Sequence, residues 1–361
     1  MTTTDRQSRP LSMGEHPLSG FALATVAAQG PGVPGDRGRP ALVVGGELVD
    51  LRSAAESAGV APAPDEPRYG MMDLLEDWDR SLDKLCLVAA FIEQVGLDDE
   101  RLRVLRSGVR LLPPITRPSK MVYAAQNYAD HVKEMRDAQR FGFNPGEVAQ
   151  SKEFNGLREG THPYVFLKAP SSLTGPYDDI EIPPEVTEMD WEVELAVVIG
   201  RRATRVSSAD ALHHVAGYMS TNDFSARNLL FRPDRERLRS DWFGGKSHDG
   251  FAPMGPVLVP AMFVPDHLDL RLRLTVNGQT RQDGNTSNLI FTPEEQIEFA
   301  SRMTTLIPGD ILATGTPGGV GQGTNSFLSP GDVVEAEVQG LGVIRNHIVR
   351  SSLSSVRGAV A

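Results

Sequence analysis

The chain has 361 residues, of which 40% are apolar and 23% are charged, and its formal net charge is −11 at pH 7. The length allows two domains or one large β-rich domain with an appendage, and the composition is that of a globular protein. The negative charge argues against a nucleic-acid partner, and no apolar run is long enough to span a membrane. The single cysteine, Cys86, excludes an internal disulfide and a thiolate-rich metal site.

Residues 21–115 are predicted to form a small α+β domain, preceded by a flexible N-terminus at residues 1–20. The N-terminal segment has no apolar run followed by a small-residue cleavage site, so we expect a cytoplasmic protein. The apolar runs in GFALATV and PALVVGGELVDL are broken by Gly and Pro, which predicts two or three strands. Apolar residues at helical spacing predict a helix over Met71–Ile92 that ends at Gly96.

Residues 116–361 form the second predicted domain, which is mainly β. Turn sequences such as VNGQ, IPGD and SPGD separate short β-branched runs, as is typical of an all-β sandwich or roll rather than a doubly wound sheet. Two helices interrupt this pattern. One is capped by Ser207 and is expected to stop at Gly217, and the other is capped by Thr292, with Glu295 completing a capping box.

The stretch DWEVELAVVIG places three acids before a buried strand. Because side chains alternate in a strand, Asp190, Glu192 and Glu194 share one face, and Leu195–Ile199 is apolar on both faces. Carboxylates gathered at the covered end of a strand repel each other and lose hydration, and a divalent cation offsets both effects. The alternative is a strand whose acids face water, as expected for Val333–Val338.

Asp223 supplies a further acid in GYMSTNDFSARN. Together with two of the strand carboxylates it would offer oxygen ligands suited to Mg²⁺, Mn²⁺ or Ca²⁺. The alternative for Asp223 is an Asx turn that caps the following segment. Zinc fits poorly, since the sequence has no HExxH motif.

His131 and Glu134 lie three residues apart in NYADHVKEM. On a helix they share one face, where the carboxylate can orient the imidazole as a general base that activates water. The alternative is an ordinary solvated helix. The glycine- and charge-rich segment 136–160 after it is predicted to be a mobile loop, and a lid carrying the pair is conceivable.

Two further segments carry groups that could bind a substrate. Lys246 lies in the tight loop GGKSHDGFAPMGP, and Arg227 follows Asp223 by four residues. The glycine-rich stretch LATGTPGGVGQG offers Thr314, Thr316 and free backbone N–H groups suited to a carboxylate. Its glycine spacing does not match a dinucleotide-binding fingerprint, and the alternative is a plain glycine turn.

In order along the chain, several motifs resemble those of the fumarylacetoacetate hydrolase family. The resemblance covers about residues 119–349 and rests on NYADHVKE, FLKAPSSLTGP, MDWEVELAVVIG, GYMSTNDFSAR, GKSHDGFAPMGP, VNGQTRQDGNTSNLIF and IPGDILATGTPGGVG. It implies a mixed β-sandwich roll, usually dimeric, with a small leading domain.

The resemblance also implies roles for individual residues. The expected metal ligands for Mg²⁺ or Mn²⁺ are Glu192, Glu194 and Asp223, which leaves Asp190 as an outer, hydrogen-bonding acid. The expected catalytic residues are His131, Glu134 and Lys246. The expected substrate contacts are Tyr128, Arg227, Leu230, Gly315 and Thr316.

The sequence departs from the family pattern at two places. Family hydrolases often carry a glutamine that reaches the substrate where this chain has Leu230, in SARNLLF, which suggests a less polar or differently shaped substrate. The segment 136–160 is longer than in compact members, so it would enlarge or re-gate the pocket.

The resulting prediction is a metal-dependent hydrolase that cleaves a C–C bond in a 1,3-dicarbonyl or 2-oxo acid. The alternatives are a decarboxylase, tautomerase, isomerase or hydratase of oxaloacetate- or hydroxymuconate-type acids. A metal-stabilised binding protein without turnover is a third hypothesis. The expected partners are a small carboxylic acid and a second copy of the chain, without nucleic acid or membrane.

Overall fold

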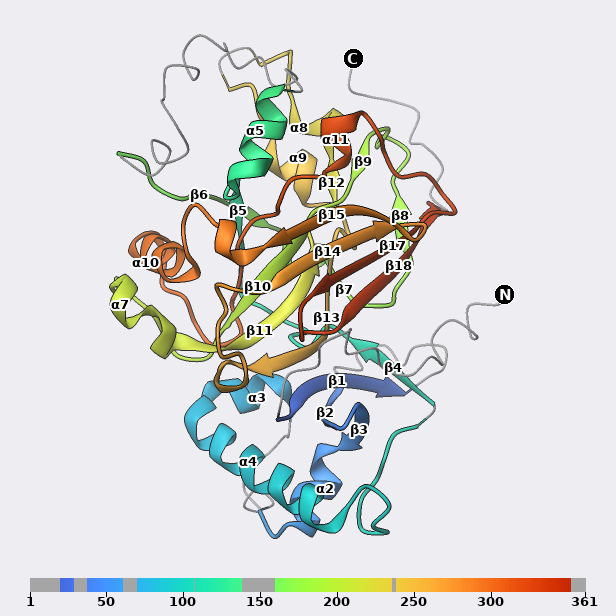
Figure 1. Ribbon diagram of the computed structural model, residues 1–361, viewed down its shortest axis with the longest axis vertical. Helices are drawn as coiled ribbons and strands as arrows, with labels where there is room; N and C mark the ends of the chain where they lie inside the picture. The colour runs from blue at the N-terminus through green and yellow to red at the C-terminus, as the bar shows by residue number, and fades with distance from the viewer. Residues whose placement is uncertain are drawn as a thin grey trace.

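The computed structural model describes residues 20–28, 38–60, 70–106, 108–137, 160–235 and 238–351 (Figure 1). Nearly all of the predicted flexible N-terminus, 1–20, and most of the predicted mobile segment, 136–160, lie outside the described residues.

A large mixed sheet runs through the described part of the protein. Nine of its eleven strands follow the order β3-β2-β1-β13-β11-β10-β16-β5-β6, while β4 pairs with β1 and β7 pairs with β13. Its strands are β1 (Ala22–Ala28), β2 (Arg39–Val44), β3 (Glu47–Asp50), β4 (Val109–Leu112), β5 (Met121–Ala125), β6 (Tyr164–Lys168), β7 (Leu173–Thr174), β10 (Val193–Ile199), β11 (Val215–Asn222), β13 (Ala252–Pro260) and β16 (Ile311–Ala313).

A second sheet packs against β10, β11 and β13 at the centre of the first (Figure 1). Within the described residues it has five strands in the order β15-β14-β17-β18-β8. These are β8 (Ile180–Ile182), β14 (Arg271–Val276), β15 (Gln279–Asn285), β17 (Val333–Val338) and β18 (Val343–Arg350). A short ribbon pairs β9 (Met189–Asp190) with β12 (Ser225–Ala226). The predicted β-sandwich roll is therefore confirmed.

Strand β10 lies between two hydrophobic cores. Leu195 and Val197 belong to the core shared with the second sheet, whereas Ala196 and Val198 belong to the core on the other face. Every residue of β10 is buried, as the apolar sequence predicts. Burying one large apolar side chain stabilises the fold by about 1.5–3 kcal/mol. Strand β10 is therefore a rigid support for the residues that lead into it.

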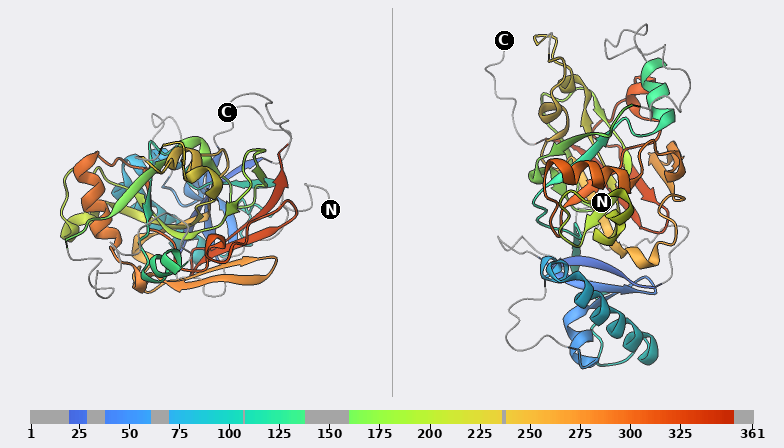
Figure 2. Two further views of the ribbon diagram at one scale, coloured as in Figure 1. Left: turned by 90° about the horizontal axis from the view of Figure 1, so that it is seen from above. Right: turned by 90° about the vertical axis from the view of Figure 1, so that its left-hand side faces the viewer.

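The N-terminal region continues the large sheet instead of standing apart from it. Leu23 of β1 pairs with Leu258 of β13, across the boundary predicted near residue 115. Leu75 and Trp78 share a core with Met219 of β11. Figure 2 shows the N-terminal strands and helices at the end of the molecule away from α5.

The helix predicted over Met71–Ile92 is wrong in one respect, because the structure has two helices there. They are α3 (Met71–Glu76) and α4 (Trp78–Val95), separated by Asp77 at φ −131° and ψ 68°. The break lies beside Trp78, which is buried in the core. The predicted stop is confirmed, since Gly96 caps α4 with φ 80°.

The other helices are short. They are α2 (Leu51–Ser57), α5 (Ala129–Asp137), α7 (Ser208–Ala211), α8 (Arg227–Leu230), α9 (Trp242–Lys246), α10 (Pro293–Met303) and α11 (Gly321–Thr324). Three of them, α5, α8 and α9, border the pocket described below. The capping box of α10 is confirmed, with Thr292 and Glu295 in the predicted roles. Ser207 is the N-cap residue of α7, although its side chain bonds Asp210 instead of the helix backbone.

The prediction that Gly217 ends a helix is wrong. The helical turns end at His214, and Gly217 lies inside β11 opposite Pro260 of β13. A Cβ at Gly217 would lie 2.2 Å from the carbonyl oxygen of Val259. Glycine is present because the two backbones approach closely. In a single sequence, a glycine required for this reason cannot be told from one that ends a helix.

We therefore predict that Gly217→Ala lowers the free energy of unfolding by about 1–3 kcal/mol, the usual cost of overpacking. Urea unfolding followed by circular dichroism measures it. The matched control is Gly318→Ala, whose new Cβ would meet nothing nearer than 3.4 Å. Equal stability of the two variants would contradict the close approach.

Candidate metal centre and active-site pocket

Strand pairing brings Glu192, Glu194 and Asp223 together. In the β10–β11 ladder Val193 lies opposite Asn222, and the N–H of Asp223 donates to the carbonyl oxygen of Glu192 at 2.8 Å. One carboxylate oxygen from each acid lies within 4.8 Å of the other two, and all three residues are buried. The acids predicted from separate segments of the sequence therefore form one cluster.

The cluster fits a hard divalent cation. One Glu194 oxygen, Oε2, accepts the N–H of Gly315 at 2.8 Å, whereas its buried Oε1 has no hydrogen-bond partner among the described residues. Burial raises the pKa of Glu194 well above its usual value, and Asp223 and Glu192 raise it further. An oxygen-only ligand set of this kind suits Mg²⁺, Mn²⁺ or Ca²⁺, whose charge would stabilise the ionised carboxylates.

Two buried lysines share Asp223. Lys246 Nζ lies 2.5 Å from Asp223 Oδ2 and 2.8 Å from Glu192 Oε2. Lys168 Nζ lies 2.5 Å from Asp223 Oδ1 and also donates to the carbonyl oxygens of Phe224 and Phe251. Each carboxylate oxygen has two lone pairs, so these bonds leave capacity for a cation.

The lysines differ in electrostatic environment. Burial lowers the pKa of Lys246, but Asp223 and Glu192 outweigh it, so the net shift is upward and the ammonium form is stabilised. Burial dominates at Lys168 and lowers its pKa to about 8, although Asp223 opposes the shift.

Sequence reasoning missed Lys168. The available signal was its position in YVFLK, two residues after Phe166, because side chains two apart in a strand share a face. Both residues are buried, whereas Leu167 between them is 59% exposed.

The strand expected from Asp190 onward is interrupted, because Asp190 belongs to β9 and β10 begins at Val193. Asp190 is nevertheless a hydrogen-bonding acid. Its oxygens accept the N–H groups of Gly321 at 2.6 Å and Gln322 at 3.0 Å, and Nε of Arg227 at 2.8 Å. Arg227 also donates to Glu192. For Glu192 burial raises the pKa, but Lys246 and then Arg227 outweigh it, so the net shift is strongly downward.

The glycine-rich loop after β16 binds carboxylates, but they belong to the protein. The N–H of Gly315 donates to Glu194, that of Gly319 donates to Glu134 at 3.0 Å, and those of Gly321 and Gln322 donate to Asp190. The expectation of free N–H groups for a substrate carboxylate is therefore wrong at these positions. Backbone N–H groups of the loop instead hold Glu194, Glu134 and Asp190 in place.

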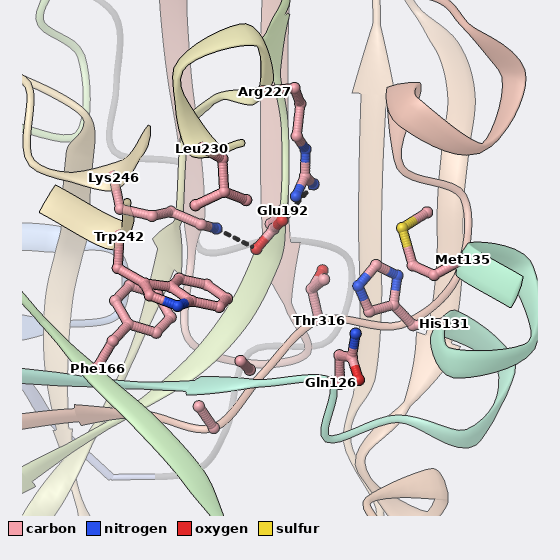
Figure 3. A pocket seen from close by; sticks show the side chains of 12 residues that line it. Gln126, His131, Met135, Phe166, Glu192, Arg227, Leu230, Trp242, Lys246 and Thr316 are labelled. Atoms are coloured by element: carbon pink, nitrogen blue, oxygen red, sulfur yellow. Dashed lines mark hydrogen bonds and ion pairs between the residues drawn. The ribbon is translucent and has the colours of Figure 1, made fainter. Parts of the chain in front are cut away.

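A pocket opens beside the acidic cluster, and Figure 3 shows it from close by. His131 and Met135 of α5 lie on one side of the pocket, Lys246 and Trp242 of α9 lie on the other, and Glu192 lies between them. The polar lining residues are Gln126, His131, Glu192, Arg227, Lys246 and Thr316. The apolar ones are Ala124, Ala125, Met135, Phe166, Leu230 and Trp242.

The predicted His–Glu pair is close but not hydrogen-bonded. His131 Nδ1 lies 3.6 Å from Glu134 Oε2, and this buried nitrogen has no hydrogen-bond partner among the described residues. Glu134 Oε2 instead accepts the N–H of Gly319. Hydrogen bonds of catalytic pairs are often long in the free enzyme and shorten when substrate binds.

Three of the five predicted substrate contacts, Arg227, Leu230 and Thr316, line the pocket. Tyr128 and Gly315 are not among the lining residues. The Tyr128 ring is fully buried, and its hydroxyl has no hydrogen-bond partner among the described residues. Burial raises the pKa of Tyr128 well above its usual value, and Glu194 adds to the shift, which keeps the phenol neutral.

A buried carboxylate cluster beside a pocket lined by an imidazole and an ammonium group, in a β-sandwich roll, defines an enzyme-type site. Residues 120–349 match the family model described as "Fumarylacetoacetate (FAA) hydrolase C-terminal". The chain therefore belongs to the fumarylacetoacetate hydrolase family, whose members include hydrolases, tautomerases and isomerases.

Named relatives span several reactions. The human protein "Oxaloacetate tautomerase FAHD2A, mitochondrial" is 41% identical over 68% of this chain and 71% of its own length. The "2,4-didehydro-3-deoxy-L-rhamnonate hydrolase" of Sphingomonas sp. (strain SKA58) is 37% identical over 72% of this chain and 84% of its own.

A solved structure is also similar over most of the chain. Maleylpyruvate hydrolase from Sphingobium sp. SYK-6, in complex with manganese(II) and pyruvate, has a TM-score of 0.64 and 26% identity, covering 92% of this chain and all of its own. Among the described helices of the present protein, none combines the length and apolarity needed to cross a membrane.

We predict that Glu194→Gln and Asp223→Asn each weaken Mn²⁺ binding at least about tenfold, because even changes around a metal's ligands typically cost 10–100-fold. Isothermal titration calorimetry measures the dissociation constant. Glu335→Gln, on the alternating strand β17, is the matched control and should leave it unchanged. Unaltered binding in both cluster variants would show that the cation binds elsewhere.

Proposed function

We propose that the protein is a divalent-metal hydrolase that cleaves the C3–C4 bond of a 2,4-dioxo acid, of the acylpyruvate type. The observation that carries this proposal is that Glu192, one of the three clustered acids, lines the same pocket as His131 and Lys246. Manganese together with pyruvate in the similar maleylpyruvate hydrolase supports it, because pyruvate is the 2-oxo acid that such a cleavage releases.

Glu192, Glu194 and Asp223 are the proposed ligands, and Mg²⁺ or Mn²⁺ is the proposed ion. A cation held there would polarise the oxygens of a 2-oxo acid. The substrate carboxylate then needs no separate binding site in the glycine-rich loop, whose N–H groups at Gly315 and Gly319 are already engaged.

The chain's own residues supply the proton transfers. His131 takes a proton from water, which attacks the carbonyl at C4, and Glu134 stabilises the imidazolium from 3.6 Å. The C3–C4 bond then breaks with its electron pair going to C3, which takes up a proton from His131. The products are a carboxylic acid and pyruvate.

Lys246 stabilises the developing negative charge. Its ammonium group has three N–H donors, of which Glu192 and Asp223 accept two. The third remains for an oxygen of the substrate. The upward-shifted pKa keeps this group charged at neutral pH.

A second candidate is keto–enol tautomerisation of a 2-oxo acid, and the 41% identity to a protein named oxaloacetate tautomerase favours it. The same imidazole would move the proton at C3, without attack by water. Decarboxylation and isomerisation or hydration of related acids use the same polarised carbonyl.

Two parallel assays with Mg²⁺ or Mn²⁺ separate these reactions. Release of a carboxylic acid from acetylpyruvate identifies the hydrolase, whereas faster loss of the oxaloacetate enol without acid or CO₂ release identifies the tautomerase. If EDTA lowers the melting temperature but neither compound reacts, the protein is a metal-stabilised binding protein.

We also propose a cellular location and an oligomeric state. We place the protein in the cytoplasm, although the human relative is named as mitochondrial. We expect a homodimer, because the large apolar side chains Tyr164 and Leu167 on β6 are 57% and 59% exposed. Size-exclusion chromatography with light scattering measures the oligomeric state.

We predict that His131→Ala reduces kcat at least about a hundredfold, the lower range for loss of a general base. His213→Ala, which removes an exposed imidazole, should keep full activity. Steady-state kinetics on acetylpyruvate, with circular dichroism to show intact folding, gives the comparison. Near wild-type turnover in His131→Ala would exclude the proposed role.

A further inference from the structure

The pocket has an apolar side that the proposed chemistry does not use. Phe166, Leu230 and Trp242, here called the apolar wall, line the pocket next to Lys246 (Figure 3). Phe166 and Leu230 are 8% and 3% exposed. Convergent apolar side chains beside a few polar groups are the usual form of a small-molecule site.

The apolar wall is built as a fixed surface. The rings of Phe166 and Trp242 stack with centroids 4.7 Å apart at an interplanar angle of 26°. Leu230 packs on the backbone of α9, because a Cβ at Gly245 would lie 2.6 Å from Leu230 Cδ1. The wall therefore has little freedom to rearrange around a polar ligand group.

The same elements also hold the acidic cluster. Strand β6 carries Phe166 and, two residues on, Lys168, which bonds Asp223. Helix α9 carries Trp242 and, one turn on, Lys246, whose Nζ lies 5.4 Å from the centroid of the Phe166 ring. A substrate bound by one end at the acids would thus present its other end to the wall at a set distance.

The described lining offers no unpaired side-chain ammonium or guanidinium for a second substrate carboxylate. Its Lys246 and Arg227 both bond acids, and Glu192 lies between them. Nε1 of Trp242 is a buried donor without a partner among the described residues, but it is neutral and can supply only one hydrogen bond. A second carboxylate on the substrate would therefore lose hydration there without an ion pair to the described lining, which is costly. An uncharged flat group would instead gain contact with the stacked rings.

We propose that the apolar wall determines specificity by accepting an uncharged apolar arm, aryl or bulky alkyl, on the acyl side of the substrate. The wall selects this arm over an arm that ends in a carboxylate. This inference rests on the proposed binding of a 2-oxo acid at the acidic cluster, and it narrows the substrate to acylpyruvates with an apolar acyl group.

The test uses two ligands that differ only at the far end of the molecule. They are 2-oxo-4-phenylbutyrate and 2-oxoglutarate, which lack the 4-oxo group and so undergo no C–C hydrolysis. With the Mn²⁺-loaded protein we expect the phenyl compound to bind at least about tenfold more tightly, a typical discrimination for a shaped apolar pocket. Isothermal titration calorimetry gives both dissociation constants.

Substitutions in the apolar wall test whether its residues cause this selectivity. Trp242→Leu should weaken binding of the phenyl compound about three- to tenfold, the contribution of an aromatic contact, and leave 2-oxoglutarate nearly unchanged. Leu230→Gln should reduce the difference between the two dissociation constants by strengthening the binding of 2-oxoglutarate. The matched control is Phe243→Leu, which alters a neighbouring side chain that is 74% exposed and should change neither constant.

Each outcome decides one of the two proposals. Equal binding of both ligands, or equal effects of Trp242→Leu and Phe243→Leu, overturns the role of the wall even if acylpyruvates are hydrolysed. Selective binding of the phenyl compound without hydrolysis of acetylpyruvate or benzoylpyruvate supports the wall and overturns the proposed hydrolase.

Discussion

The structure depends on pairing the charges that it buries. Asp190, Glu192, Glu194 and Asp223 are almost inaccessible to water, as are the cations Lys168, Lys246 and Arg227. An unpaired ion in such surroundings costs several kcal/mol. Each acid therefore needs partners at hydrogen-bond distance, and β6, α8, α9 and the glycine-rich loop each reach the same point to supply them.

The buried atoms without a hydrogen-bond partner among the described residues include Oε1 of Glu194, Nδ1 of His131, Nε1 of Trp242 and the Tyr128 hydroxyl. The first two belong to the proposed metal ligand and the proposed base. One is an oxygen suited to a cation and the other is a nitrogen suited to a proton. The scaffold holds the remaining groups in place, and the chemistry is proposed at these two atoms.

Local sequence patterns predict much of the fold and part of the site. The alternation before a doubly apolar strand led to Asp190, Glu192 and Glu194 without choosing among them. The spacing of His131 and Glu134 placed that pair on one face of a helix, because such signals lie within a few residues. Asp223 was proposed as a further oxygen ligand from its sequence context, and the ordered family motifs then narrowed its partners to Glu192 and Glu194. Lys168, Phe166 and Trp242 were not identified, since their roles arise from contacts between distant segments.

The errors have the same origin. Gly217 was assigned to a helix end because a glycine required by a neighbouring strand looks identical in the sequence to one that ends a helix. The glycine-rich loop was expected to offer free N–H groups to a substrate carboxylate, but the tertiary structure shows that these groups bind Glu194, Glu134 and Asp190.

That loop has a consequence for how the protein can change during evolution. Its hydrogen bonds to the three acids come from backbone N–H groups, which every residue except proline possesses. Substitutions in the loop can therefore alter these hydrogen bonds mainly by changing the conformation of its backbone. At Gly319 the shape leaves no alternative, because a Cβ would lie 2.0 Å from the carbonyl oxygen of Arg281. We therefore expect substitutions that change substrate preference at the pocket-lining side chains of α8, α9 and β6, while the backbone bonds from the loop to the acids are kept.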